Sequence, residues 1–110
     1  MLKYKNNLLF ADDVSVFDAA VKVGTPFYLY GKKKLLENYK ALDGAFPKVK
    51  HIICYAVKAN ENPQLLKILA EKGCGCDIVS VGELNLAVSC GISPRKIVFA
   101  GVGKTDVEIT

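Results

Sequence analysis

The sequence predicts an α/β protein built around a parallel sheet. The chain has 110 residues, the size of one ordinary domain, and 51% of them are hydrophobic. Three short apolar runs, at 52–57, 76–79 and 97–100, alternate with stretches of helical apolar spacing. Strands that recur about every twenty residues with helices between them are typical of βαβ units, whose strands pair in parallel.

The first half of the chain has weaker signals. Residues 8–10 are compatible with an edge strand, and residues 14–23 have apolar side chains at helical spacing. After Thr25-Pro26, residues 27–30 predict a short aromatic strand. The apolar stripe from Gly31 to about Phe46 predicts a helix that Pro47 stops.

The second half has clearer helix boundaries. The pair Asn62-Pro63 predicts an N-cap with proline at the first helical position, and Gly73 ends that helix. Two capping boxes, Ser80 with Glu83 and Thr105 with Glu108, start two more helices. The three strands predicted here are too few to close a parallel sheet into a barrel. We therefore expect these residues to be the amino-terminal part of a longer protein and to be inactive alone.

Composition excludes several classes of function. The net charge is +4, but the lysines are scattered and Arg95 is the only arginine, which argues against a nucleic-acid surface. No apolar run has the length of a membrane span and no signal peptide is evident, so we expect a cytoplasmic protein. The four cysteines are Cys54, Cys74, Cys76 and Cys90; with one histidine and no C-x-x-C pair they predict neither a metal site nor disulfides.

Lys58 is the first candidate for chemistry. It directly follows the run 52–57, which reads as a strand covered on both faces, and the carboxyl ends of parallel strands are where ligands gather. An amine in a desolvated pocket is a nucleophile that can form a covalent bond with an aldehyde or ketone. The alternative is a lysine at a strand end that extends into solvent.

Asp77 is unusual because it interrupts an apolar strand, where a carboxylate normally has a polar partner or a ligand. Glu83 has a structural alternative at the third position of its capping box. Tyr55 is explained as well by packing as by chemistry. Gly101-Val-Gly-Lys104-Thr105 suggests a phosphate-binding loop, but the pattern needs a glycine where Val98 stands, so a plain strand-to-helix turn competes with it.

Three ordered motifs carry a family resemblance. Tyr55-Ala-Val-Lys58-Ala-Asn60 resembles the lysine motif of the fold-type III, alanine-racemase-like pyridoxal-phosphate enzymes, and it continues into Glu61-Asn-Pro63 as in the decarboxylases. Gly75-Cys-Asp77-Ile-Val-Ser80-Val-Gly-Glu83 resembles their second motif, with Cys76 where an aromatic and Val81 where a glycine are common. Residues 101–106 resemble the third segment of the diaminopimelate decarboxylases, and 25–30 resemble the entry into the barrel.

The resemblance implies a (β/α)8 TIM barrel that binds pyridoxal 5'-phosphate. Lys58 would be the catalytic residue bonded to the cofactor, and Asp77 a cofactor contact. Supporting positions around them would be Tyr55, Ser80, Glu83 and Lys104. Residues 25–110 would form the first βα units of the barrel, and residues 1–24 would contribute to a second, β-rich domain. The groups that grip the phosphate and the pyridine nitrogen would lie beyond residue 110.

The implied activity is the decarboxylation of meso-diaminopimelate to L-lysine and carbon dioxide in lysine biosynthesis. The implied assembly is a homodimer that acts on a small amino acid, without nucleic-acid or membrane partners. An ornithine- or arginine-type decarboxylase of the same fold and a protein that binds the cofactor without catalysis are alternatives. A small nucleotide-binding α/β module built on Gly103-Lys104-Thr105 is a further one.

Overall fold

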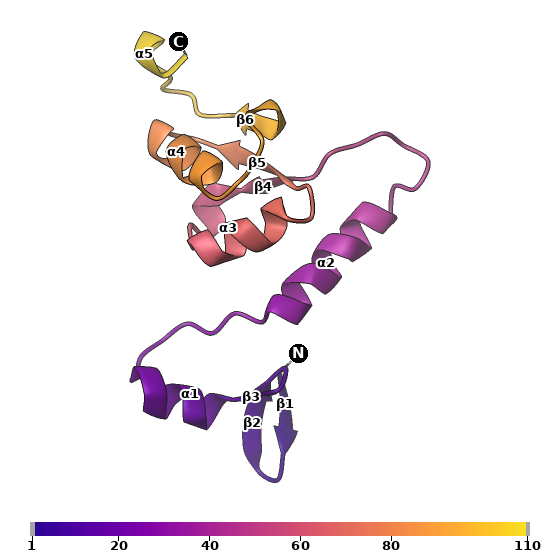
Figure 1. Ribbon diagram of the computed structural model, residues 1–110, viewed down its shortest axis with the longest axis vertical. Helices are drawn as coiled ribbons and strands as arrows, with labels where there is room; N and C mark the ends of the chain where they lie inside the picture. The colour runs from indigo at the N-terminus through magenta and orange to yellow at the C-terminus, as the bar shows by residue number, and fades with distance from the viewer. Residues whose placement is uncertain (1, 110) are drawn as a thin grey trace. The chain divides into compact units, whose positions relative to one another are not determined.

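The structure, a computed structural model, describes residues 2–109. The chain divides into two compact units, residues 1–45 and 46–110, which are described separately. The first unit begins with strands β1 (Leu2–Lys5), β2 (Leu8–Ala11) and β3 (Val14–Ser15), which form an antiparallel sheet in the order β1-β2-β3 (Figure 1). The strand expected at 8–10 is therefore the middle strand of this sheet and not an edge strand.

Helix α1 (Val16–Val23) follows β3, and the Ser15 side chain accepts a hydrogen bond from the Asp18 N–H at 3.2 Å. It begins later than the apolar spacing from residue 14 predicted, because Val14 and Ser15 pair with β2. The strand expected at 27–30 is wrong: these residues have no strand partner among those described, although the Tyr28 and Tyr30 rings stack at 6.3 Å. The helix expected next is confirmed as α2 (Lys32–Gly44).

The second unit contains the predicted parallel sheet. Strands β4 (Cys54–Ala56), β5 (Gly75–Ile78) and β6 (Ile97–Phe99) pair in parallel in the order β4-β5-β6. Strand β4 is shorter than the apolar run 52–57 that predicted it, because the chain turns at Val57 into the one-turn helix η1 (Val57–Ala59). A second such turn, η2 (Pro94–Lys96), precedes β6.

Helices α3 (Pro63–Ala70), α4 (Val81–Ser89) and α5 (Asp106–Ile109) complete this unit. The predicted caps are confirmed. Asn62 Oδ1 accepts the Gln64 N–H at 2.9 Å before α3, and Gly73 ends that region with φ of +81°. Gly91, after α4, has φ of +90°. None of the helices among residues 2–109 is long and apolar enough to cross a membrane.

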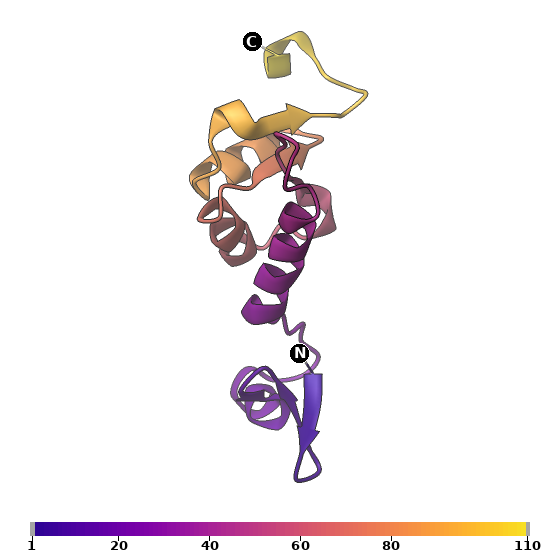
Figure 2. The same ribbon diagram turned by 90° about the vertical axis from the view of Figure 1, so that its right-hand side faces the viewer.

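The core of the second unit lies on one face of its sheet, under α3 and α4 (Figure 2). Because side chains alternate along a strand, Cys76 and Ile78 of β5 point into this core, and Asp77 between them points away from it. Burying one of its large side chains, such as Leu66 of α3, contributes about 1.5–3 kcal/mol. The expectation that both faces of β4 are covered is not met within this unit, since these helices cover one face.

Candidate functional site

Lys58 lies at the carboxyl end of β4, as the sequence predicted. It occupies the middle of η1, whose turn is closed by a hydrogen bond from the Asn60 N–H to the Val57 carbonyl at 3.0 Å. The side chain before it, Val57, is fully buried in the core and anchors the turn. Lys58 itself is exposed, so the described residues do not provide the desolvated environment that was expected for its amine.

Asp77 lies on the neighbouring strand at the same end of the sheet. Its backbone is in register with Ala56, two residues before Lys58, and with Val98 of β6. Its Oδ1 exposes less than 1 Å² and has no hydrogen-bond partner among the described residues. A buried carboxylate oxygen without a partner is costly and is uncommon away from functional sites. The sheet therefore places an exposed amine and an unpaired carboxylate oxygen on adjacent strands, at one edge.

Cys54 shares the sheet face of Asp77, because it stands two residues before Ala56 on β4. Burial raises the pKa of the Cys54 thiol, and the negative charge of Asp77 raises it further. The sequence did not mark Cys54 as part of the site, since its place beside Asp77 depends on the strand register. Burial also raises the pKa of Cys74, and that of Cys76 to about 11.

All four cysteines are free thiols. Among residues 2–109, no three histidine, cysteine or acidic side chains are grouped so as to hold a metal ion. With their pKa values raised, Cys54, Cys74 and Cys76 stay protonated and poorly nucleophilic at neutral pH.

Ser80 and Glu83 form the predicted capping box at the start of α4. The Ser80 hydroxyl oxygen accepts the Glu83 N–H at 3.2 Å, and Glu83 Oε2 accepts the Val79 N–H at 2.6 Å. Glu83 is only 6% exposed, and this bond gives its carboxylate a structural role. It holds the backbone that follows Asp77.

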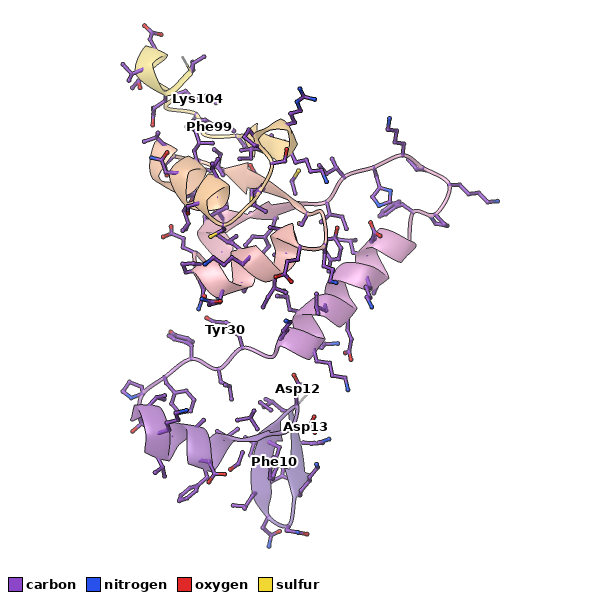
Figure 3. The ribbon with its side chains drawn as sticks, viewed as in Figure 1. Phe10, Asp12, Asp13, Tyr30, Phe99 and Lys104 are labelled. Atoms are coloured by element: carbon purple, nitrogen blue, oxygen red, sulfur yellow. The ribbon has the colours of Figure 1, made fainter. Side chains whose placement is uncertain are left out.

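Tyr55 lies on the opposite, helix-covered face, where it packs against the core. Its hydroxyl donates to the Asn60 carbonyl at 3.3 Å and so supports the loop that carries Lys58. Lys104 is not brought to the edge between Lys58 and Asp77. Its Nζ donates to the Gly101 carbonyl and stands 5.1 Å from the centre of the Phe99 ring, and Figure 3 shows the two side chains together.

Residues 32–110 match the family model described as "Pyridoxal-dependent decarboxylase, pyridoxal binding domain". The chain belongs to this family. The cofactor of the family is pyridoxal 5'-phosphate, and the resemblance of the three sequence motifs is confirmed at the level of the family.

The most similar relatives include two diaminopimelate decarboxylases. That of Aquifex aeolicus is 50% identical over 109 residues, which is 99% of this chain and 26% of the relative. That of Vibrio cholerae is 46% identical over 101 residues, covering 92% of this chain and 24% of the relative. The crystal structure of the M. jannaschii diaminopimelate decarboxylase in complex with L-lysine aligns with a TM-score of 0.95 at 36% identity, over 99% of this chain and 26% of that one. The chain thus spans about a quarter of the length of these relatives.

The residues at the sheet edge fit the cofactor. An exposed lysine amine at a strand end is the group that an aldehyde cofactor requires. On the adjacent strand, Asp77 Oδ1 is an acceptor that residues 2–109 leave without a partner. Both groups lie on the sheet edge where α/β folds bind their ligands.

Proposed function

We propose that this chain is the amino-terminal part of a pyridoxal-phosphate enzyme that decarboxylates meso-diaminopimelate to L-lysine and carbon dioxide. The observation that carries the proposal is the placement of Lys58 and Asp77 on adjacent strands at one sheet edge, with Asp77 Oδ1 buried and without a hydrogen-bond partner among the described residues. The substrate is inferred from the relatives, which are diaminopimelate decarboxylases at up to 50% identity. One carboxylate would leave as carbon dioxide, and a proton would take its place.

Lys58 is the residue proposed to react. Lys58 Nζ would hold the cofactor by condensing with its aldehyde group with loss of water, and the substrate amine would displace Lys58 in exchange. Bound pyridoxal phosphate supplies an electron sink for the electron pair that decarboxylation leaves behind. Once displaced, the Lys58 amine would be free to carry a proton to or from the substrate.

Asp77 is proposed to contact the cofactor or the released Lys58 amine. Its Oδ1, which no described residue donates to, would accept a hydrogen bond from a donor at this edge. Around this pair, Tyr55 would support the Lys58 loop, while Ser80 and Glu83 would fix the turn after Asp77. Lys104 would act on the third loop, where it already binds the Gly101 carbonyl.

The organisation of the complete protein is also part of the proposal. Residues 25–110 would supply the first βα units of a (β/α)8 barrel, and residues 1–24, which contain all three antiparallel strands, would join a β-rich domain. By its resemblance, the enzyme would be a cytoplasmic homodimer. Analytical ultracentrifugation of the complete protein would test the assembly.

The test of the reaction is to trap the amine. The complete protein is incubated with pyridoxal phosphate, reduced with borohydride, digested and mapped by mass spectrometry, with the Lys58→Arg variant as control. We expect the pyridoxyl group on Lys58 and its loss in the variant. An adduct on Lys104 or on another lysine would refute the assignment of Lys58.

Substrate choice is tested by following carbon dioxide release from meso-diaminopimelate, ornithine and arginine. We expect meso-diaminopimelate to be consumed with a kcat/KM at least about a hundredfold above the other two, because a polar site rejects substrates that leave its groups unpaired. A preference for ornithine or arginine would refute the assignment of meso-diaminopimelate as the substrate. Cofactor binding without carbon dioxide release from any of the three amino acids would refute the assignment of a decarboxylation.

A further inference from the structure

The loop that carries Lys58 connects β4 to α3 over residues 57–62 (Figure 1). Its first part is the single turn of η1, and a helix of one turn is marginally stable by itself, because few hydrogen bonds offset the cost of ordering its backbone. Lys58 is exposed, so the packing of its own side chain does not fix the turn. The direction in which the lysine amine leaves the loop therefore depends on the contacts that the neighbouring residues make.

Val57 holds the turn on the side before Lys58. Its side chain is fully buried and belongs to the core cluster that contains Leu66 of α3 and Ile78 of β5. A close-packed core leaves such a side chain little freedom, so the backbone that carries it is held as well. The attachment of the turn on the side after Lys58 comes from another residue.

Asn60 provides that attachment through three separate hydrogen bonds. Its N–H donates to the Val57 carbonyl at 3.0 Å, which closes η1. Its carbonyl accepts the Tyr55 hydroxyl at 3.3 Å. Its side-chain Oδ1 accepts the Asn62 N–H at 3.0 Å. Both backbone groups and the side chain of Asn60 are thus engaged, two residues after Lys58.

These bonds connect the turn to the two elements on either side of it. Tyr55 belongs to β4, and its ring packs against the core. Asn62 is the N-cap of α3, where its own side chain accepts the Gln64 N–H at 2.9 Å. An asparagine side chain that accepts the N–H two residues further on forms a tight local turn. The Asn60 side chain therefore fixes the path of the chain from η1 into α3.

The start of α3 does not by itself account for this side chain. The helix already has its N-cap in Asn62 and a proline, Pro63, at its first position. Asn60 has a φ of −166°, an extended conformation that any residue adopts, so the backbone does not require asparagine there. What the Asn60 side chain adds is a link between the turn that carries Lys58 and the helix that follows it.

We infer that Asn60 is a positioning residue for Lys58: by joining η1 to Tyr55 and to Asn62, it holds the lysine amine in the direction from which it meets the cofactor aldehyde. A reacting group that is already oriented does not lose that freedom when the bond forms, so the bond is more favourable. The inference rests on the proposed attachment of pyridoxal phosphate to Lys58, and not on the choice of substrate. Asn60 acts through the backbone of the turn.

The bond between Asn62 and Asn60 is tested first, by hydrogen exchange measured with NMR on the complete protein without cofactor. In Asn60→Ala, exchange of the Asn62 amide should accelerate by about fivefold or more, because the donor loses its acceptor. Asn60→Asp keeps an acceptor oxygen at the same position and should retain most of the protection. Unchanged exchange of the Asn62 amide in Asn60→Ala would overturn the inference.

The second measurement compares the binding of two forms of the cofactor. Pyridoxal phosphate has the aldehyde that bonds to Lys58, whereas pyridoxamine phosphate has an amine in its place and binds without that bond. In Asn60→Ala, the dissociation constant of pyridoxal phosphate should rise by about fivefold or more, as expected for the loss of a hydrogen bond, while that of pyridoxamine phosphate stays within about twofold. Tyr55→Phe removes another link to Asn60 and keeps the packed ring, so it should produce the same pattern.

Asn62→Ala is the matched control. It removes a side-chain hydrogen bond of the same kind, the N-cap of α3, and leaves all three bonds of Asn60 in place. We expect a lower melting temperature, with both dissociation constants within about twofold of those of the unmodified protein. If Asn62→Ala weakened pyridoxal phosphate binding as much as Asn60→Ala does, the effect would belong to the whole loop, and the role assigned to Asn60 would be wrong.

The remaining outcomes separate this inference from the proposed function. Faster Asn62 exchange with unchanged affinity for pyridoxal phosphate would overturn the inference. An equal loss of affinity for both forms of the cofactor would also overturn it, because that pattern marks a general structural role. If borohydride traps no adduct on Lys58 in the unmodified protein, the proposed function fails, and the positioning role fails with it. If Lys58 holds the cofactor but no amino acid is decarboxylated, the proposed reaction is overturned, while the two dissociation constants still decide the role of Asn60.

Discussion

Replacing Asp77 by alanine removes a carboxylate whose Oδ1 is buried and has no hydrogen-bond partner among the described residues. A buried polar atom that is left unpaired costs about 1–3 kcal/mol relative to the same atom in water. The substitution therefore removes a penalty, and the atoms it deletes face the small side chain of Ala56 across the ladder. We expect the free energy of unfolding of the cofactor-free protein to stay within about 1 kcal/mol of the original or to rise.

The cofactor complex should respond in the opposite direction. If Oδ1 accepts a hydrogen bond in that complex, the bond involves a charged acceptor and contributes about 1.5–3 kcal/mol. Its loss should raise the dissociation constant of pyridoxal phosphate by about 10- to 150-fold, since 1.4 kcal/mol corresponds to a factor of ten. The same substitution would thus leave the fold intact and impair the site.

The assay pairs denaturant unfolding of the cofactor-free complete protein with a cofactor titration. Asp77→Asn, which keeps the shape and loses the charge, shows how much of the effect is electrostatic. Val98→Ala is the matched control, because Val98 lies beside Asp77 on the same face and is 52% exposed. A loss of several kcal/mol of stability together with normal cofactor affinity would refute the reasoning and make Asp77 a structural residue.

Three further predictions concern single residues. Lys58→Ala should abolish turnover and change the stability by less than about 0.5 kcal/mol, because the side chain is exposed; activity assays and thermal melts check this. Gly75→Ala should lower stability by about 1–3 kcal/mol in unfolding experiments, because the added Cβ would clash with the Lys96 carbonyl oxygen. Cys76, whose pKa is raised from 9.0 to about 11, stabilises the fold as a neutral thiol below pH 9. This contribution to the free energy of unfolding should be lost as the pH rises toward 11. Alkylation provides a second check: at pH 8, Cys76 of the native protein should resist iodoacetamide, while Cys76 of the unfolded protein should react.

The features that the sequence predicted correctly depend on local chemistry. Helix caps act within a few neighbouring residues, so the sequence pattern is enough to predict them. Examples are the Asn62 cap, the Ser80–Glu83 cap and the glycine at residue 73. The parallel sheet was also predictable, because the spacing of the apolar runs leaves room for one helix between strands. The family motifs identified the edge of the sheet that carries Lys58 and Asp77.

The features that the sequence did not predict depend on contacts between distant residues. The aromatic alternation at 27–30 indicates a strand, but a strand forms only where another strand offers hydrogen bonds, and none of those described does so. The run 52–57 is apolar throughout, so its composition could not show that pairing stops at Ala56. The place of Cys54 beside Asp77 depends on the register of the two neighbouring strands.

Strand β5 shows how stability and chemistry are divided between the two faces of the sheet. Cys76 and Ile78 are buried under the helices, where larger or smaller side chains change the packing. Asp77 between them has no hydrogen-bond partner for Oδ1 among residues 2–109, so the packing of this part of the chain does not account for a carboxylate there. Because the pleat keeps these roles on opposite faces, the chain can carry a costly acid at the centre of its sheet without weakening the core that holds the acid in position. We therefore propose that a ligand at the carboxyl edge, and not the folding of the sheet, accounts for the acid at this position.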